Sequence, residues 1–276
     1  VQNDLTKKQG DAITIPLVGA LNAAAGPNNG STTLVGAEKA LPNDGHRISV
    51  RVVRDAVVVS MEEEQASPIA IRDAGKVALK DLAGRYLRND IVTAMGSIQS
   101  VSYATASAAQ RNAWNAANGD RVLFGNSVSL YNATHATALA NITGTMRLSR
   151  GIVSLLKRRA QSAITANGEG IRPFTFGEDE ETYVLFVGTE AYRDLKTDLE
   201  TVHKDARERN LDNPLFTGTT SLFWDGVVVR EIPEIPATGN VGAVAARVAP
   251  VYLCGAQALG VAYAQPTKTT VRKEDD

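Results

Sequence analysis

The sequence predicts an α+β fold built on a long β-hairpin, an unusually long helix and a later group of strands and helices. Residues 12–18 and 46–60 alternate apolar and polar side chains, which is the pattern of half-buried strands. Apolar residues then recur at spacings of three and four from Ile71 to Tyr86, which indicates a helix. The chain therefore mixes sheet and helix, and its 276 residues suffice for one large domain or two modest ones.

The first two strands are predicted to form the arms of a hairpin. The alternation slips in the second arm at Val53 and Arg54, which predicts a bulge or a twist. Between the arms lie 27 residues with turn signals at 27–30 and 42–45, which indicate an elaborate tip. A ten-residue arm reaches about 33 Å, and an isolated two-stranded hairpin is marginal in water. The hairpin therefore needs another surface to rest on, either its own domain or a second copy.

The long helix is predicted to begin at Ser67 and Pro68, a hydroxyl N-cap followed by a proline at the first helical position. If it continues to about Ile98, it measures about 45 Å at 1.5 Å per residue. That is at least about twice the length of an ordinary globular helix. Shorter helices and further strands are predicted over residues 107–117, 148–163, 183–187, 189–206, 222–232 and 249–264.

Composition and motifs give no support to catalysis or to tight nucleic-acid binding. The 29 Lys and Arg balance 30 Asp and Glu, so the net charge of -1 creates no general attraction for phosphate. The three histidines, His46, His135 and His203, fit no catalytic or metal-binding motif and are interpreted as solvated structural residues. Cys254 is the only cysteine and lies in an apolar run, so it is interpreted as a buried thiol. We expect no catalytic residue, cofactor or metal, and no apolar stretch reaches the ~18 residues of a membrane helix.

Two acidic clusters and several arginines are candidates for contacts between copies of the chain. The acidic clusters are alternatively interpreted as acid/base pairs, a cation site or solvated turns, and the arginines as a phosphate site. Arg47 and Arg51 share one face of the second arm, and in a nearly neutral chain we favour an acidic neighbour over phosphate. The candidate contact residues are Glu38, Arg47, Arg51, Arg54, Glu62, Glu63, Glu64, Glu178, Asp179, Glu180 and Glu181.

Several motifs, in order along the chain, resemble one known family. The segment NPLFTGTTSLFWDGVVVREIPE at residues 213–234 resembles N-P-[IL]-F-T-G, an aromatic, a Gly and a valine-rich strand in the major capsid proteins of tailed bacteriophages related to phage N-four. In the hairpin tip, LVGAEKAL is similar to the L-x-G-x-E-x-x-L element of that family. Further matching pieces are KKQGDAITIPLVGAL, SVRVVRDAV, SPIAIRDAGKVALKDLAGRYLRND, DRVLFGN, IRPF, YVLFVGTEAYRDLKTD and LCGAQALGVAYA, so the resemblance covers nearly the whole chain.

The resemblance implies the phage coat fold of the Hong Kong 97 type. It implies an N-terminal arm fragment at 1–10, an extended loop at 11–62, a peripheral domain at 63–118, an axial domain at 119–245, and at 246–276 a strand returning to the peripheral domain and a C-terminal tail. The spine helix of the peripheral domain would occupy residues 67–98. Only about ten residues precede the hairpin, so we expect a shortened N-terminal arm. Arg85 and Tyr86 stand where the family has a nearby Trp, which predicts a smaller packing change.

The resemblance also implies a function. It implies a major capsid protein that self-assembles as hexamers and pentamers into the icosahedral head around double-stranded DNA, without sequence-specific binding. Its partners would be a portal protein and decoration proteins, and it would assemble in the host bacterial cytoplasm and reside in the virion capsid. The alternative is an encapsulin-like shell protein of a bacterial nanocompartment, whose cargo would be protein. A third hypothesis, an enzyme with an unrecognised carboxylate site, has no motif to support it.

Overall fold

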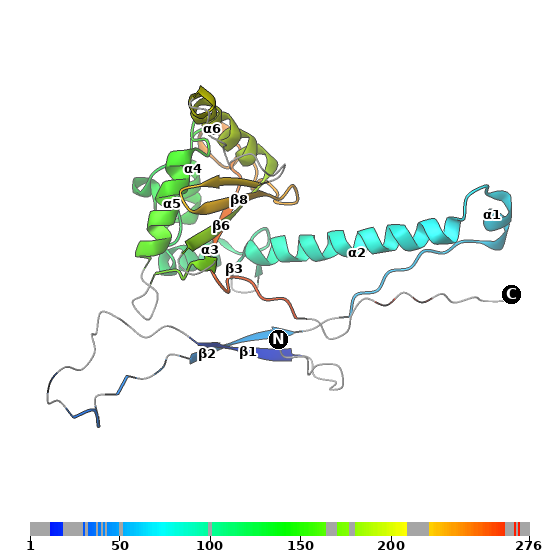
Figure 1. Cartoon of the computed structure of the whole chain (residues 1–276), viewed down its shortest axis with the longest axis horizontal. Coiled ribbons are helices and arrows are strands. Elements are labelled where there is room, and N and C mark those ends of the chain that lie inside the picture. The colour runs from blue at the N-terminus through cyan, green and yellow to red at the C-terminus, as the bar shows by residue number, and fades with distance from the viewer. Residues whose placement is uncertain are drawn as a thin grey trace. The chain divides into compact units, whose positions relative to one another are not determined.

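In the computed structural model, the chain forms two compact units, whose elements are labelled in Figure 1. Unit 1 comprises Val1–Leu21, Val35–Ile91 and Leu259–Asp276, and unit 2 comprises Asn22–Leu34 and Val92–Ala258. The structure describes residues 12–18, 30, 33–36, 38–39, 41, 43–49, 52–98, 101–163, 170–176, 180–208, 221–262, 268 and 270.

Unit 1 contains the predicted hairpin. Strand β1 (Ala12–Val18) pairs antiparallel with β2 (Asn43–Ser49), and Ile13 lies opposite Ile48. The first arm is confirmed, but the second arm, predicted over 46–60, is wrong in its extent. Ser49 pairs with Ala12, where the described part of the ladder ends, and residues 52–60 form no strand. The slip in alternation at residues 53–54 therefore follows the end of pairing and is not a bulge within it.

The long helix of unit 1 begins later than predicted. Ser60 caps a short helix, α1 (Met61–Ala66), because its Oγ accepts from the Glu63 N–H at 3.2 Å while Glu63 accepts from the Ser60 N–H at 3.3 Å. Ser67 is the C-cap of α1, so the prediction that it starts the long helix is wrong. The capping box at Ser60 starts a helix earlier, and Pro68 falls in the connection between the two helices.

Helix α2 (Ile71–Met95) follows with 25 residues and extends about 38 Å at 1.5 Å per residue. It ends before Gly96, three residues short of the predicted Ile98. Its surface carries an i, i+4 ion pair, with Arg85 Nη2 3.0 Å from Asp81 Oδ2.

Unit 2 is built on a five-stranded sheet of order β5-β6-β8-β7, in which β6 also pairs with β9. Strand β6 runs parallel to β8, and the other pairs are antiparallel. The strands are β5 (Phe174–Phe176), β6 (Glu180–Val187), β7 (Ser221–Trp224), β8 (Val227–Glu231) and β9 (Val251–Cys254). Because β9 joins β6, residues 251–254 lie in one sheet with strands of the segment 119–245. The division into extended loop, peripheral and axial domains stays a prediction.

The stretch 222–232, predicted as strand, is split by a tight turn. Asp225 and Gly226 both have positive φ, 50° and 73°, as the two-residue turns of hairpins require. Strands β7 and β8 are therefore the two arms of a short hairpin. Strand β9 covers only part of the predicted 249–264.

The helices of unit 2 follow the predicted pattern closely. Ser107 caps α3 (Ala108–Ala117) by a capping box with Gln110, and the helix ends before Asn118, as predicted. The helix predicted over 148–163 is α5. The remaining elements are α4 (His135–Ala140), α5 (Arg150–Ser162), α6 (Thr189–Glu208), the 3-10 turns η2 (Val128–Leu130) and η4 (Ala243–Ala245), and the short strands β3 (Ser97–Ile98) and β4 (Val101–Ser102).

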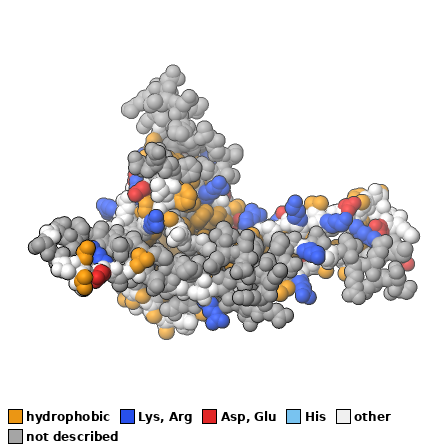
Figure 2. All heavy atoms as spheres, turned by 60° about the horizontal axis from the view of Figure 1, so that its bottom comes forward, with side chains coloured by type: hydrophobic (Ala, Val, Ile, Leu, Met, Phe, Trp, Pro, Cys, Tyr) orange, Lys and Arg blue, Asp and Glu red, His pale blue; other side chains and the backbone are white. Residues whose placement is uncertain are grey.

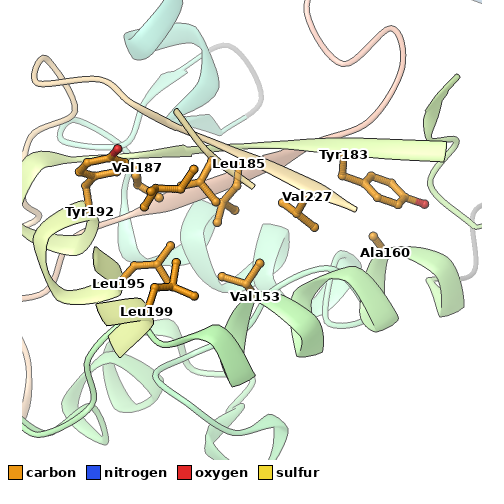
Figure 3. Packing of buried hydrophobic residues seen from close by; sticks show 11 residues of the cluster. Val153, Ala160, Tyr183, Leu185, Val187, Tyr192, Leu195, Leu199 and Val227 are labelled. Atoms are coloured by element: carbon orange, nitrogen blue, oxygen red, sulfur yellow. The ribbon is translucent and has the colours of Figure 1, made fainter. Parts of the chain in front are cut away.

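The main core of unit 2 lies between the sheet and helices α5 and α6 (Figure 3). Alternate residues of β6, Tyr183, Leu185 and Val187, are buried, whereas the intervening positions 184 and 186 are half-buried. Leu195 and Leu199, four residues apart on one face of α6, belong to the same core cluster. One face of β6 is therefore fully buried, and the other is half-buried.

Candidate functional site

Unit 1 contains no buried hydrophobic residue among those that the structure describes. The buried hydrophobic side chains of the described residues lie between Val92 and Ile235, within unit 2. Even the long helix α2 has no buried residue from Ile71 to Ile91. Helices in proteins are stabilised chiefly by packing of an apolar face, so α2 lacks in its own chain the support that its length calls for.

Apolar side chains instead cover the surface of this unit. Val58 is 90% exposed in the segment 52–60, and Val77 is 69% exposed on α2. Figure 2 shows hydrophobic side chains interspersed with Lys and Arg along α2. Further exposed apolar residues of the unit are Val35, Leu41, Val52, Val53, Val57, Ile69, Leu82, Tyr86, Leu259 and Val261. Extended apolar surface of this kind marks a site of protein interaction.

One face of α2 carries a shallow hollow centred on a glycine. Val77, Lys80, Asp81, Gly84 and Arg88 line it, at the spacings of three and four that place residues on one helix face. A Cβ added at Gly84 would meet no atom of this chain within 4 Å, so the packing of the chain itself does not require glycine. Glycine inside a helix costs about 1 kcal/mol relative to alanine. A close approach by another molecule is a physical reason for glycine at this position.

Two of the three arginines that are predicted to contact a neighbouring copy are among the described residues. Arg47 is exposed on β2, and Arg54 is exposed in the segment 52–60. Arg51 lies outside the described residues. In the hairpin tip, Glu38 Oε2 accepts from the Gly36 N–H at 2.7 Å, which is a contact within the turn itself.

The predicted acidic contacts include two residues that already have partners in their own chain. Glu63 completes the capping box of α1, and Glu64 Oε2 lies 2.7 Å from Arg72 Nη2. Glu62 and Glu181 are exposed. Glu178 and Asp179 lie outside the described residues, and for Glu180 only the backbone in β6 is described. The structure brings none of the described acidic residues together with Arg47 or Arg54 in an ion pair, and contacts between copies stay a prediction.

His135, predicted to be solvated, is buried at the start of α4. Its backbone N–H donates to Asn112 Oδ1 at 2.9 Å, and its ring centroid lies 5.6 Å from those of Phe124 and Tyr103. The Arg111 guanidinium stacks 4.6 Å over the Tyr103 ring and donates to the Tyr103 carbonyl at 2.7 Å. Burial first, and the nearby Arg111 charge second, lower the pKa of His135 below 6.5. The side chain is therefore neutral at pH 7 and has a packing role.

The lowered pKa of His135 predicts a pH-dependent stability. The unfolded chain takes up a proton near pH 6.5, whereas the folded chain takes it up only at lower pH, so stability is complete above about pH 6.5 and falls as the pH drops below it. We expect the free energy of unfolding of the dissociated subunit to decrease from about pH 7.5 to about pH 5.5. Urea unfolding at both values measures this. His135→Gln should weaken the dependence, and an unchanged slope would contradict it.

Cys254 and Trp224 lie in packed parts of unit 2. Burial raises the pKa of the Cys254 thiol, which is half-buried in β9, so the thiol stays protonated and weakly reactive at pH 7. The Trp224 Nε1–H donates to Ser154 Oγ at 3.2 Å, and this hydrogen bond joins β7 to α5.

In the described part of the chain, no cluster of three His, Cys, Asp or Glu residues is arranged to hold a metal ion. No described helix is long and apolar enough to span a bilayer.

Together, a well-packed unit 2 and an apolar, exposed unit 1 define a protein that interacts through a large surface. The sequence matches the family model described as phage capsid protein over residues 1–275. The chain belongs to this family. The match confirms the resemblance carried by the sequence motifs.

Solved structures agree with this assignment. One similar structure is the cyanophage Pam1 capsid asymmetric unit, with 36% identity, a TM-score of 0.76, and coverage of 93% of this chain and 72% of that chain. The capsid of Ralstonia phage GP4 is a second similar structure, with 17% identity, a TM-score of 0.68, and coverage of 92% of this chain and 70% of that chain. Among curated proteins, none matches the sequence. The chain is a phage major capsid protein located in the virion capsid, and the nanocompartment alternative is not favoured.

Proposed function

We propose that copies of this chain form the hexamers and pentamers of an icosahedral head, in the coat fold of the Hong Kong 97 type. One observation carries the proposal: among the described residues, all buried hydrophobic side chains lie in unit 2, and the apolar side chains of unit 1 are exposed or half-buried. A neighbouring copy that covers unit 1 would supply the missing apolar partner. Permanent assemblies bury about 2,000–5,000 Å² per contact, which is enough to stabilise a helix and a hairpin of this size.

The hairpin of unit 1 is the proposed extended loop, at residues 11–62, and α2 is the proposed spine helix. The hairpin is a separate two-stranded sheet, which is marginal by itself in water. Each contact with a neighbour can be modest, because every subunit is held at several sites at once. In the proposed shell, the exposed surfaces of unit 1 therefore make these contacts with neighbouring copies.

The proposed contents of the head are double-stranded DNA bound without sequence specificity. The net charge of -1 supports a wall that does not grip DNA, since many phosphate contacts by Lys and Arg would raise affinity steeply. A portal protein and decoration proteins are the proposed partners. The proposed role is structural, without catalysis, and its support is membership of the capsid family.

Electron microscopy tests this proposal. The full chain, expressed alone and negatively stained, is expected to give closed shells or rings of subunits. Particles from infected host cells should contain nuclease-sensitive density once they are opened. A compact monomer in light scattering would contradict shell formation, and protein cargo in place of DNA would contradict the proposed contents.

Reversing the charge of Arg51 tests the proposed role of the hairpin arginines. Arg51→Glu should lower particle yield by roughly tenfold or more, because a like charge opposes the carboxylates of a neighbour. The subunit should stay folded by circular dichroism, since the exposed Arg47 on the same predicted strand face has no buried surroundings to disturb. Arg51→Lys, which keeps the charge, is the control. Normal shells from Arg51→Glu would contradict the proposed contact.

A further inference from the structure

The loop between β8 and β9 holds a strained valine at its tip. Val244 has φ 53° and ψ 40°, and the following Ala245 has φ 57°. Left-handed backbone is uncommon for any residue except glycine, and for a β-branched residue it is a genuine outlier. Such strain persists only where the surrounding structure fixes the conformation, and it concentrates at functional sites.

Backbone hydrogen bonds hold the tip in this conformation. The Ala243 N–H donates to the Ile142 carbonyl at 2.7 Å. The Gly242 N–H donates to the Ala246 carbonyl at 2.9 Å, and the Ala246 N–H donates to the Ala243 carbonyl at 3.0 Å. A Cβ at Gly242 would lie 2.6 Å from the Ile142 carbonyl oxygen, so the close approach of the loop to residue 142 requires glycine. The base of the loop is closed by a bridge between Gly239 and Val248. The tip is therefore a preformed projection on unit 2.

Nothing within the chain benefits from valine at this position. The Val244 side chain is fully exposed, so it contributes no packing that would offset the strain of its backbone. Asparagine or glycine would fit the same backbone at lower cost. Val241 and Val244 are both exposed at the tip, and Val244 is the one of the two with positive φ. A contact with another molecule would supply the compensation for this strain.

We propose that the tip, residues 241–246, is a contact surface for a second copy of this chain. This inference rests on the proposed shell assembly. A second copy fits because residues 235–246 carry no charged side chain, so no charge has to leave water when identical subunits close on the tip. The nearest charge in sequence, Arg247, is paired within unit 2, with Nη1 3.1 Å from Glu190 Oε1.

The variant Val244→Asn tests whether the Val244 side chain contacts a second copy or stays exposed to solvent in the particle. Asparagine tolerates the left-handed conformation, so the Tm of the dissociated subunit should rise by about 2–4 °C. Loss of the apolar contact should at the same time lower particle yield by roughly tenfold, because the loss recurs in every subunit. Val128→Asn, at an exposed valine of η2 without positive φ, is the matched control and should leave both quantities unchanged.

Sedimentation of assembled particles and thermal unfolding of subunits give the two readouts. A raised Tm with full particle yield would overturn the inference and leave shell assembly intact. Full yield with loss of a bound decoration protein would overturn it in favour of another occupant. If Val244→Asn lowers the Tm, Val244→Gly repeats the test, and normal yield from that variant overturns the inference. A wild-type chain that forms no particles would overturn the shell role and the inference with it.

Discussion

Val58→Asp combined with Val77→Asp is expected to abolish shell formation while the dissociated subunit stays folded. Both valines are largely exposed in the single chain, so the free energy of unfolding should change by about 0.5 kcal/mol or less per site. If a neighbouring copy covers them, each aspartate becomes a buried, unpaired carboxylate, which costs about 3–5 kcal/mol. Sedimentation and negative-stain microscopy measure the particles, and circular dichroism measures the folding of the subunit.

The matched control replaces both valines by isoleucine, which keeps the surface apolar and uncharged. We expect particles from this variant. Shells of normal yield and size from the aspartate variant would show that the surface around Val58 and Val77 stays in water in the assembled head. That result would contradict the proposed burial of unit 1.

Leu185→Ala is expected to destabilise the subunit by about 2–5 kcal/mol. Leu185 is 0% exposed in the middle of β6, where it packs within the core shared with α5 and α6. Truncation removes apolar contacts and leaves a cavity that close-packed neighbours fill only partly. Urea unfolding of the dissociated subunit measures the change in the free energy of unfolding.

Leu82→Ala on α2 is the control for this truncation. Leu82 is 45% exposed, and alanine has the higher helix propensity, so the change in the free energy of unfolding should stay below about 0.5 kcal/mol. Equal losses from the two variants would contradict the contrast between a packed unit 2 and an exposed unit 1.

Local sequence patterns predicted most secondary-structure elements because their signals are short-range. The alternation in residues 12–18 and the capped segment at Ser107 each depend on neighbours a few residues away, and both elements have the predicted bounds. The start of α2 was mispredicted because Ser67 and Ser60 are both suitable caps. The capping box with Glu63 decides between them.

Burial could not be predicted from the same patterns. The apolar spacing along Ile71–Tyr86 marks a helix face suited to packing, yet Leu82 and Tyr86 on that face are exposed in the single chain. A sequence shows which face is apolar, but not which chain covers it. Conversely, the burial of His135 depends on Tyr103, Phe124 and Arg111, and no local motif joins these residues to it.

The strained tip had no sequence signal at all. Valine is among the residues least suited to positive φ, so a local pattern at Val244 predicts extended backbone. The conformation is imposed by the contact of the loop with Ile142, about a hundred residues earlier in the chain.

Hydrogen exchange of α2 amides, compared between assembled particles and dissociated subunits, tests most directly whether neighbouring copies cover unit 1. We predict that amides of Ile71–Ile91 exchange at least about tenfold more slowly in the particle, while amides of β6 are protected in both states. Equal exchange of the α2 amides in the two states would contradict the account.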